Sequence, residues 1–474
     1  AANIVGFQKV AFNTSGVAAH DTMLNLTGGA ATKVDWTNLT ATGTAVKPLT
    51  LLKNDSGIDL EGYTGAAKSE TTDTTETNVD VRKNNDGRIT AITYEGYQFA
   101  GVTTPVIIGT DVYGGISRAG NSTHDNVITV NGDYTNVYGG HTSGAGTTKD
   151  DKDNSYSNSV TITGGTIGNV YGGYTAAADG TTNHNTVTLA GGTVTGTVSG
   201  GNRTAQGNKL VVNANARVGK IENFEKYVFN YKESMAADPM LTLTGGAAAM
   251  NLSAIEANGT VTETPTTLVH NAAGLTIADY DNKPKSMLNA DGTRETNLDV
   301  KKTGTLLTDI VRYSSYSFKG TTKSTTSGGN TWGGRSSAGN TTAENSVTIT
   351  GGNHTNIYGG WTTGTGSQAA ADKRGDSISN KVTVNGAASV AGTVYGGYTN
   401  VTGGRATGNE VTLEKATVGS VVGGYGTTAS GNVINLTDAT VSGSVTGGIG
   451  ATVNSNGSSF RSTTVSGADA SGTI

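Results

Sequence analysis

Internal repetition is the feature that most constrains how this chain folds. Phe7 in IVGFQKVAFN matches Phe224 in IENFEKYVFN, and LNLTGGA at Leu24 returns as LTLTGGA at Leu241, both at a displacement of 217 residues. A repeat this long predicts an array of stacked units in preference to one globular core.

The matches divide the chain into two tandem modules. In each, a first part with few Gly-Gly pairs precedes a glycine-rich part. The first part is expected to be less regular β structure without long helices, and the second to form regular coils. The predicted bounds are 1–217, with parts 1–100 and 101–217, and 218–474, with parts 218–320 and 321–474.

A shorter motif recurs through the glycine-rich parts: usually an apolar residue, then an aromatic residue, then Gly-Gly, as in NVYGG. In some copies another residue replaces the aromatic one. Successive marks are 24 to 37 residues apart. They fall at Tyr113, Tyr138, Tyr171 and Ser199, then at Trp332, Tyr358, Tyr395, Val422 and Thr446. Intervals of this size suit coils of a few short strands each.

Most intervals also carry an alternating strand such as NSVTITGG around Val160, in which Val and Ile face inward and Thr outward. We therefore predict an all-β fold, a parallel β-helix (β-solenoid) of two tandem modules. Gly-Gly is expected to supply positive φ angles at the corners, and the Asn opening each strand to cap the turn or to stack as a ladder. The outward threonines also suggest ice binding, but irregular coil lengths argue against it. They are Thr161, Thr163, Thr186, Thr188, Thr348, Thr350, Thr383 and Thr412.

Composition narrows the functional class. Only 34 % of residues are hydrophobic while Gly contributes 71, which suits a thin solenoid core better than a thick globular one. The formal charge of −5 without basic runs gives nucleic acid little to bind. Cysteine is absent, and no cofactor is expected. Since no signal peptide or 18-residue apolar run occurs, an export signal or membrane anchor is expected outside this chain.

The NxVxIxGG…VYGG coils and the junctions at Ile4 to Gly29 and Ile221 to Gly246 resemble passenger regions of repeat-rich bacterial autotransporter adhesins of the Gram-negative Firmicute type. The resemblance covers essentially the whole chain. It implies a right-handed β-helix, exported and held at the cell surface by an outer-membrane barrel not present in this chain. It supplies no catalytic residues.

Two aromatic columns are predicted. The first is interpreted as a structural ladder, with a ligand platform as the alternative. The second follows each Gly-Gly, where it is expected to be more exposed and to bind a surface glycan or protein, with packing as the alternative. The ladder comprises Tyr113, Tyr138, Tyr171, Trp332, Tyr358 and Tyr395; the second comprises His141, Tyr174, Trp361, Tyr398, Tyr425 and Arg335, with Asn202 in line.

Other polar groups give weaker signals. The charged loops at 149–154 and 372–376 are interpreted as solvated loops in preference to calcium sites, and Arg374-Gly375-Asp376 as a chance match to an integrin-type tripeptide. No metal site is expected. For a polysaccharide-degrading enzyme, acids must converge from neighbouring coils. The candidates are isolated: Asp125, Asp133, Glu344, Glu410 and Glu414, and the six histidines (20, 124, 141, 184, 270 and 354) have no HExxH spacing.

These patterns favour a non-enzymatic, extracellular stalk or adhesin segment, attached to the outer membrane only through an anchor elsewhere. The alternative is a self-assembling fibre subunit that pairs with copies of itself, and a polysaccharide-degrading enzyme ranks below both. Apolar, uncapped terminal coils would favour the fibre, whereas a groove beside the aromatic column would favour the adhesin.

Overall fold

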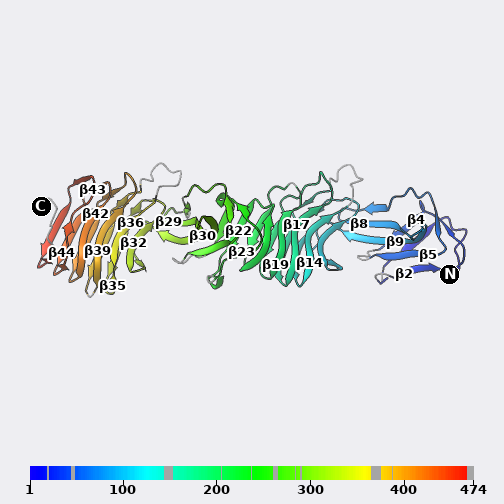
Figure 1. Ribbon diagram of the computed structural model, residues 1–474, viewed down its shortest axis with the longest axis horizontal. Helices are drawn as coiled ribbons and strands as arrows, with labels where there is room; N and C mark the ends of the chain where they lie inside the picture. Colours follow the sequence, from blue (N-terminus) through cyan, green and yellow to red (C-terminus); the bar gives the residue numbers. More distant parts are fainter. Residues whose placement is uncertain are drawn as a thin grey trace. The chain divides into compact units, whose positions relative to one another are not determined.

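The computed structural model is all-β, with parallel strands stacked as the coils of a β-solenoid (Figure 1). It describes residues 1–15, 17–18, 21–43, 48–143, 153–203, 205–235, 238–259, 265–282, 284–288, 291–364, 375–386 and 388–466. Within those ranges the helical segments are the single turns η1 (Glu233–Met235) and η2 (Leu252–Ala254). The predicted fold class is confirmed.

The chain forms two compact units whose bounds differ from those of the sequence modules. The first comprises 1–260, 268–278 and 303–309, and the second comprises 261–267, 279–302 and 310–474. Residue 217 lies inside β21 (Ala216–Glu222), which pairs in parallel with strands on both sides. The first unit therefore continues past the point at which the sequence begins to repeat.

The first unit starts with two three-stranded coils followed by an antiparallel segment. Three parallel pairs, β1–β4, β2–β5 and β3–β6, make the coils, and β7, β8 and β9 pair antiparallel, with β9 also on β5. The bounds are β1 (Val10–Asn13), β2 (Thr22–Leu26), β3 (Thr32–Asp35), β4 (Leu39–Thr42), β5 (Leu49–Asn54), β6 (Ile58–Glu61), β7 (Lys68–Thr71), β8 (Thr75–Lys83) and β9 (Ile89–Gln98).

Glycine-rich coils follow, and each places one strand in a long sheet and one in a second sheet. The long sheet holds β10 (Val106–Ile108), β11 (Asp111–Ser117), β14 (Tyr134–Thr142), β17 (Thr166–Thr175), β19 (Thr193–Gly201), β21, β23 (Leu241–Leu243) and β26 (Thr266–Asn271). The second holds β13 (Val127–Asn131), β16 (Ser159–Gly164), β18 (Thr186–Leu189), β20 (Lys209–Val212), β22 (Lys226–Asn230) and β25 (Ile255–Asn258). Short strands fill some corners: β12 (Thr123–His124), β15 (Ser155–Tyr156), β24 (Ala248–Met250) and β27 (Leu275–Ile277).

The second unit repeats this plan in three sheets. Before them come β28 (Lys285–Leu288), β29 (Arg294–Thr303) and β30 (Leu306–Ser317), the last divided between the units. One sheet holds β31 (Thr325–Ser327), β32 (Asn330–Ser336), β35 (Asn353–His354), β36 (Asn356–Thr362), β39 (Ser389–Thr399), β42 (Thr417–Tyr425), β45 (Thr440–Val441), β46 (Val445–Thr446) and β49 (Thr464–Val465). The others are β33 (Thr342–Ala343), β37 (Ser377–Ile378), β40 (Arg405–Thr407), β43 (Thr428–Ser430) and β47 (Thr452–Asn454), and β34 (Ser346–Ile349), β38 (Lys381–Asn385), β41 (Glu410–Glu414), β44 (Val433–Thr437) and β48 (Gly457–Arg461).

The core is a thin line of aliphatic side chains inside each stack. Because side chains alternate across a strand, Val160 and Ile162 of β16 are fully buried while Thr161 faces outward. The same positions repeat in register, so that Val160 lies opposite Val187, and Ile162 opposite Leu189. A low hydrophobic share is therefore enough for a continuous core.

The asparagines that open the second-sheet strands form the predicted ladder. Asn126 Nδ2 donates to Asn158 Oδ1 at 2.7 Å, and Asn158 Nδ2 to Asn185 Oδ1 at 3.1 Å. The second unit repeats this from Asn345 to Asn456. These amides are mostly buried, and each bond joins neighbouring coils along the stack.

Gly-Gly does not supply the positive φ angles predicted for it. Those angles fall on the residue before each ladder Asn, among them Asp125, Ser157 and His184. The Gly-Gly pairs are required by space instead, because a Cβ at Gly172 would lie 2.8 Å from both the Cβ of Asn185 and the carbonyl oxygen of Gly200. The neighbouring coil approaches too closely for any side chain.

A buried glutamate fastens each antiparallel segment to the first glycine-rich coil. Glu76 of β8 is fully buried and accepts hydrogen bonds from Ser117 Oγ (2.6 Å), the Arg118 amide (2.6 Å) and Asn121 Nδ2 (2.7 Å). Glu295 of β29 repeats the arrangement with the second module's residues, Ser336, Ser337 and Asn340. We call each arrangement a carboxylate clasp.

Candidate functional site

Parallel pairing in register sets the tyrosines of the first column in one row across β11, β14 and β17. Tyr113 and Tyr138 stack with ring centroids 5.1 Å apart, and Tyr138 and Tyr171 with centroids 5.3 Å apart. Their planes differ by 15° and 9°. The next residue in the row is Ser199, so the stack ends at Tyr171.

The second column lies beside the first. His141 stacks on Tyr174 with centroids 4.8 Å apart and planes 1° apart, and it meets Tyr138 edge to face at 4.8 Å. Tyr174 makes the same edge contact with Tyr138 and Tyr171. The two rows interlock into one surface, the aromatic face of the first unit.

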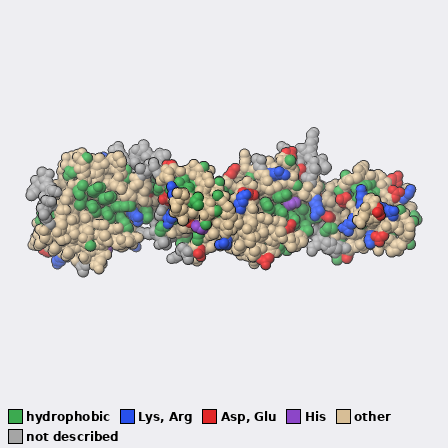
Figure 2. Space-filling model, viewed as in Figure 1, with side chains coloured by type: hydrophobic (Ala, Val, Ile, Leu, Met, Phe, Trp, Pro, Cys, Tyr) green, Lys and Arg blue, Asp and Glu red, His purple; other side chains and the backbone are tan. Residues whose placement is uncertain are grey.

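The second unit has an aromatic face of the same design. In its first row Tyr358 stacks on Tyr395 at 5.1 Å, and in its second row Tyr398 stacks on Tyr425 at 4.7 Å. Edge contacts join the rows, and Trp332 and Trp361 extend them to the first coils. Figure 2 shows hydrophobic side chains gathered over β36, β39 and β42, and a second gathering over β14 and β17.

The expected difference in exposure between the columns is absent. All members of both rows are part-buried, except that Trp332 is buried. The physical reason is that the rows pack against each other, so each shields its neighbour. An inner ring such as Tyr138 is covered on both faces by the next tyrosines of its own row. A sugar ring cannot stack on it, since only edges and hydroxyl groups remain accessible.

Burial keeps the aromatic faces uncharged near neutral pH. It raises the pKa of Tyr138 above its usual range and that of Tyr358 to about 12. It lowers the pKa of His141 to about 4, so this imidazole is neutral in the folded chain. Both faces therefore present apolar rings in place of a charged recognition surface.

Arg335 stands at the head of the second row in the second unit and is held by rings. Its guanidinium carbon lies 4.2 Å from the Tyr316 ring centroid, 4.3 Å from that of Trp332 and 5.1 Å from that of Trp361. In the first unit Arg118 lies over Tyr97 at 5.3 Å. Arg335 is thus engaged within the fold, and the binding role predicted for it stays a prediction.

The charged loops fall partly outside the described residues, which exclude 149–152 and 372–374. Asp376 is described and buried, and it accepts hydrogen bonds from the Arg405 amide (2.8 Å) and guanidinium (2.7 Å). The acid of the Arg-Gly-Asp tripeptide is therefore occupied by an internal ion pair. An integrin-type partner would have to break that pair.

Two histidines form ion pairs with aspartates in the described part of the chain. His270 pairs with Asp309 at 2.8 Å, yet the nearby Thr308 hydroxyl donates to Asp309 and not to the imidazole. His124 pairs with the adjacent Asp125. No cluster of three His, Asp or Glu that could hold a metal ion occurs among the described residues, and His20 lies outside them.

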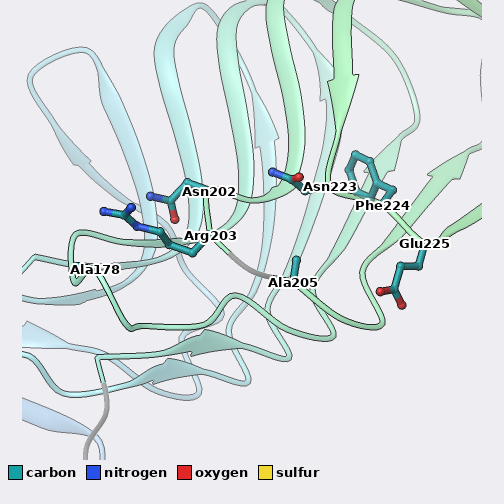
Figure 3. A pocket seen from close by; sticks show the side chains of 7 residues that line it. All are labelled: Ala178, Asn202, Arg203, Ala205, Asn223, Phe224 and Glu225. Atoms are coloured by element: carbon teal, nitrogen blue, oxygen red, sulfur yellow. The ribbon is translucent and has the colours of Figure 1, made fainter. Parts of the chain in front are cut away.

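A hollow of about 500 Å³ opens beside the second row of the first unit (Figure 3). It is lined by Ala178, Asn202, Arg203, Ala205, Asn223, Phe224 and Glu225. Asn202 lies at the hollow and is the residue after Tyr174 in the second row. The two are equivalent because Gly173 pairs with Gly201 in the parallel sheet, and each is the next residue along its strand. The sequence places Asn202 in the column, but it does not show that a hollow opens beside it.

Comparison with known proteins adds no functional assignment: no family model, curated protein or solved structure matches the chain. Across the described residues, no helix is long and apolar enough to cross a membrane.

Proposed function

We propose that the chain is a non-enzymatic stalk and adhesive segment of an extracellular bacterial surface protein, similar to an autotransporter passenger. The observation that carries the proposal is the continuity of its axial contacts. Buried asparagine ladders and stacked rings join successive coils of the glycine-rich parts, as along the ladder from Asn345 to Asn456. Such contacts suit a spacer that must resist bending and extension.

Adhesion in this proposal comes from many weak contacts repeated along the stack. Outward threonines recur in register on successive coils, as at Thr348, Thr383 and Thr412, so one chain can touch an extended partner several times. Linked weak contacts raise overall affinity by orders of magnitude without any single tight site. A surface glycan or protein is the proposed partner, and a right-handed coil is the expected geometry.

The test is retention of beads coated with the chain on surfaces bearing glycans or host proteins. We expect retention under flow to rise steeply with coating density, because avidity grows with the number of simultaneous contacts. Beads coated with an unrelated all-β protein at the same density serve as the control. Beads that wash off every surface at all densities would refute the adhesive role.

A fibre subunit remains the second candidate, in which copies of the chain pair through exposed apolar side chains such as Val453 and Phe460. Val453 is 46 % exposed and Phe460 is 55 % exposed. Phe229, which holds the corresponding position after the asparagine ladder of the first unit, is fully buried. If copies of the chain pair here, sedimentation should show concentration-dependent association that Phe460→Ser abolishes; a monomer at all concentrations would reject the fibre.

A further inference from the structure

We propose that the hollow at Asn202, Arg203, Asn223 and Glu225, the row-end hollow, binds one pyranose ring of an uncharged glycan. The choice of ligand class rests on the proposed adhesive function. The site itself is argued from the geometry of the first unit alone.

The hollow lies where the row of rings ends. In the second unit the row continues from Tyr398 to Tyr425, with the two rings stacked. In the first unit the residue after Tyr174 is Asn202, whose Nδ2 donates to the Thr175 carbonyl at 2.8 Å and whose Oδ1 accepts from the Thr175 amide at 2.9 Å. The amide preserves the coil contact, and the hollow opens beside it.

The side chains around this space have hydrogen-bonding capacity to spare. Arg203 Nη2 donates to the Ala176 carbonyl at 3.3 Å, and its Nε and Nη1 have no hydrogen-bond partner among the described residues. Glu225 Oε2 accepts from the Gly207 amide at 2.7 Å, while Oε1 accepts no bond there. Asn223 uses its Nδ2 for the Gly201 carbonyl and leaves Oδ1 available within the same described region.

These free groups suit neighbouring hydroxyls of a sugar, each of which both donates and accepts. Figure 3 shows Arg203 and Glu225 at opposite sides of the hollow with Asn223 between them. Donors on one side and acceptors on the other match a polyhydroxylated ring. Phe224, which is 9 % exposed, adds an apolar wall for the carbon-bound hydrogens.

The charges of the hollow select against charged ligands. One arginine and one glutamate line it, and the hydrogen bonds of their side chains go to the Ala176 carbonyl and the Gly207 amide. An acidic sugar would gain from Arg203 and lose to Glu225, and a basic one the reverse. A volume of about 500 Å³ lies in the range typical of small-molecule sites, which favours one sugar unit over a long groove.

Two residues of the wall, Asn223 and Phe224, are held by hydrogen bonds within the fold, whereas Arg203 and Glu225 are exposed. Asn223 has a left-handed backbone with φ of 58°, fixed by its side-chain bond to Gly201. Phe224 is fixed through its carbonyl, which accepts from the Tyr227 hydroxyl at 3.3 Å. Preorganisation lowers the ordering cost of binding, so a weak ligand can still be recognised specifically.

The experiment is saturation-transfer NMR and titration of the whole chain with methyl glycosides of glucose, galactose, mannose and N-acetylglucosamine, and with methyl glucuronide. We expect at least one neutral glycoside to bind. Arg203→Ala and Glu225→Gln should each weaken it at least tenfold, and Asn202→Tyr, which restores the ring present in the second unit, should abolish binding. Arg217→Ala, at an exposed arginine outside the hollow, is the matched control and should leave affinity unchanged.

Hydrogen exchange of strands β17 and β19 checks that each variant keeps the fold. The proposal is overturned if no neutral glycoside binds the wild-type chain, if Asn202→Tyr binds as well as wild type, or if methyl glucuronide binds more tightly than every neutral glycoside. Its failure is separable from that of the stalk proposal. Wild-type beads that stay attached without any glycoside binding reject the hollow alone, and glycoside binding without bead retention rejects the adhesive role alone.

Discussion

Replacing Glu76 by glutamine should open the first carboxylate clasp. The Glu76 carboxylate accepts five hydrogen bonds, from Ser117 Oγ, the Arg118 and Ala119 amides, Asn121 Nδ2 and Asn78 Nδ2, at 2.6 to 3.2 Å. Every partner donates to the carboxylate, and of the five only the Ser117 hydroxyl can also accept. A glutamine at this site therefore turns an NH₂ group toward donors whichever way its amide is flipped.

The size of the loss follows from the number of bonds on each oxygen. Oε2 accepts two bonds and Oε1 three. In its better orientation the glutamine amide places NH₂ at the Oε2 position, and the two hydrogen bonds accepted there are lost. A buried hydrogen bond to a charged group contributes roughly 1.5–3 kcal/mol. We expect Glu76→Gln to lower the local unfolding free energy by roughly 3 to 6 kcal/mol, and Glu295→Gln to do the same in the second unit.

Hydrogen exchange of peptides containing residues 117–121 is the assay. A loss of this size should speed exchange of the Arg118 and Ala119 amides by about two to four orders of magnitude, since about 1.4 kcal/mol is tenfold. Glu70→Gln, at an exposed position of β7, is the control. Equal exchange in Glu76→Gln and Glu70→Gln would show that the clasp does not hold the antiparallel segment to the coil.

Two further predictions concern the aromatic face and the Gly-Gly pairs. Since burial lowers the pKa of His141 from 6.5 to about 4, its neutral form contributes stability that is present above pH 6.5 and lost as the pH falls toward 4, by roughly 3 kcal/mol. His141→Tyr, which supplies the ring found in the next coil, should remove this part of the pH dependence in urea unfolding at pH 7 and 4.5; equal losses in both proteins would contradict it. Gly172→Ala should cost roughly 1–3 kcal/mol through overpacking. Gly29→Ala, where a Cβ meets no atom within 4 Å, should change the urea midpoint little, and equal effects of the two would refute the steric account.

Much of the fold was predictable because a solenoid repeats its own contacts. Once Val160 and Val187 are recognised as equivalent, their pairing in register follows, and so does the ladder from Asn158 to Asn185. The reason for Gly-Gly was predicted wrongly. A glycine in a sequence does not reveal whether its φ angle or its surroundings require it, and here non-glycine residues such as Ser157 adopt the left-handed conformation.

The clasp and the hollow were beyond sequence reasoning for different physical reasons. Glu76 sits in an acid- and threonine-rich stretch that gives no sign of burial, and its partners at Ser117 and Asn121 lie 41 and 45 residues away. The hollow is lined by residues of neighbouring coils, from Ala178 to Glu225. Asn202 is recognisable as a row member, but the free groups of Arg203 and Glu225 come together only when three coils are stacked.

The coil strands are similar between the two modules, whereas the loops that follow Gly-Gly differ in length and sequence. This difference has a steric cause. At Gly140 an added Cβ would lie 2.7 Å from Asn158 Nδ2, and at Gly424 it would lie 2.5 Å from Asn432 Nδ2. Except at Gly201, where an added Cβ would meet Thr182, the second glycine of these pairs and the ladder Asn form one fitted contact, although 18 residues separate them in the first case and 8 in the second. This contact and the strand pairing fix the register of each coil. The loop between the second glycine and the ladder Asn can therefore change length without shifting the stack. That freedom is what allows the edge of a rigid coil array to vary, and it is where a recognition site such as the row-end hollow can arise at little cost to the fold.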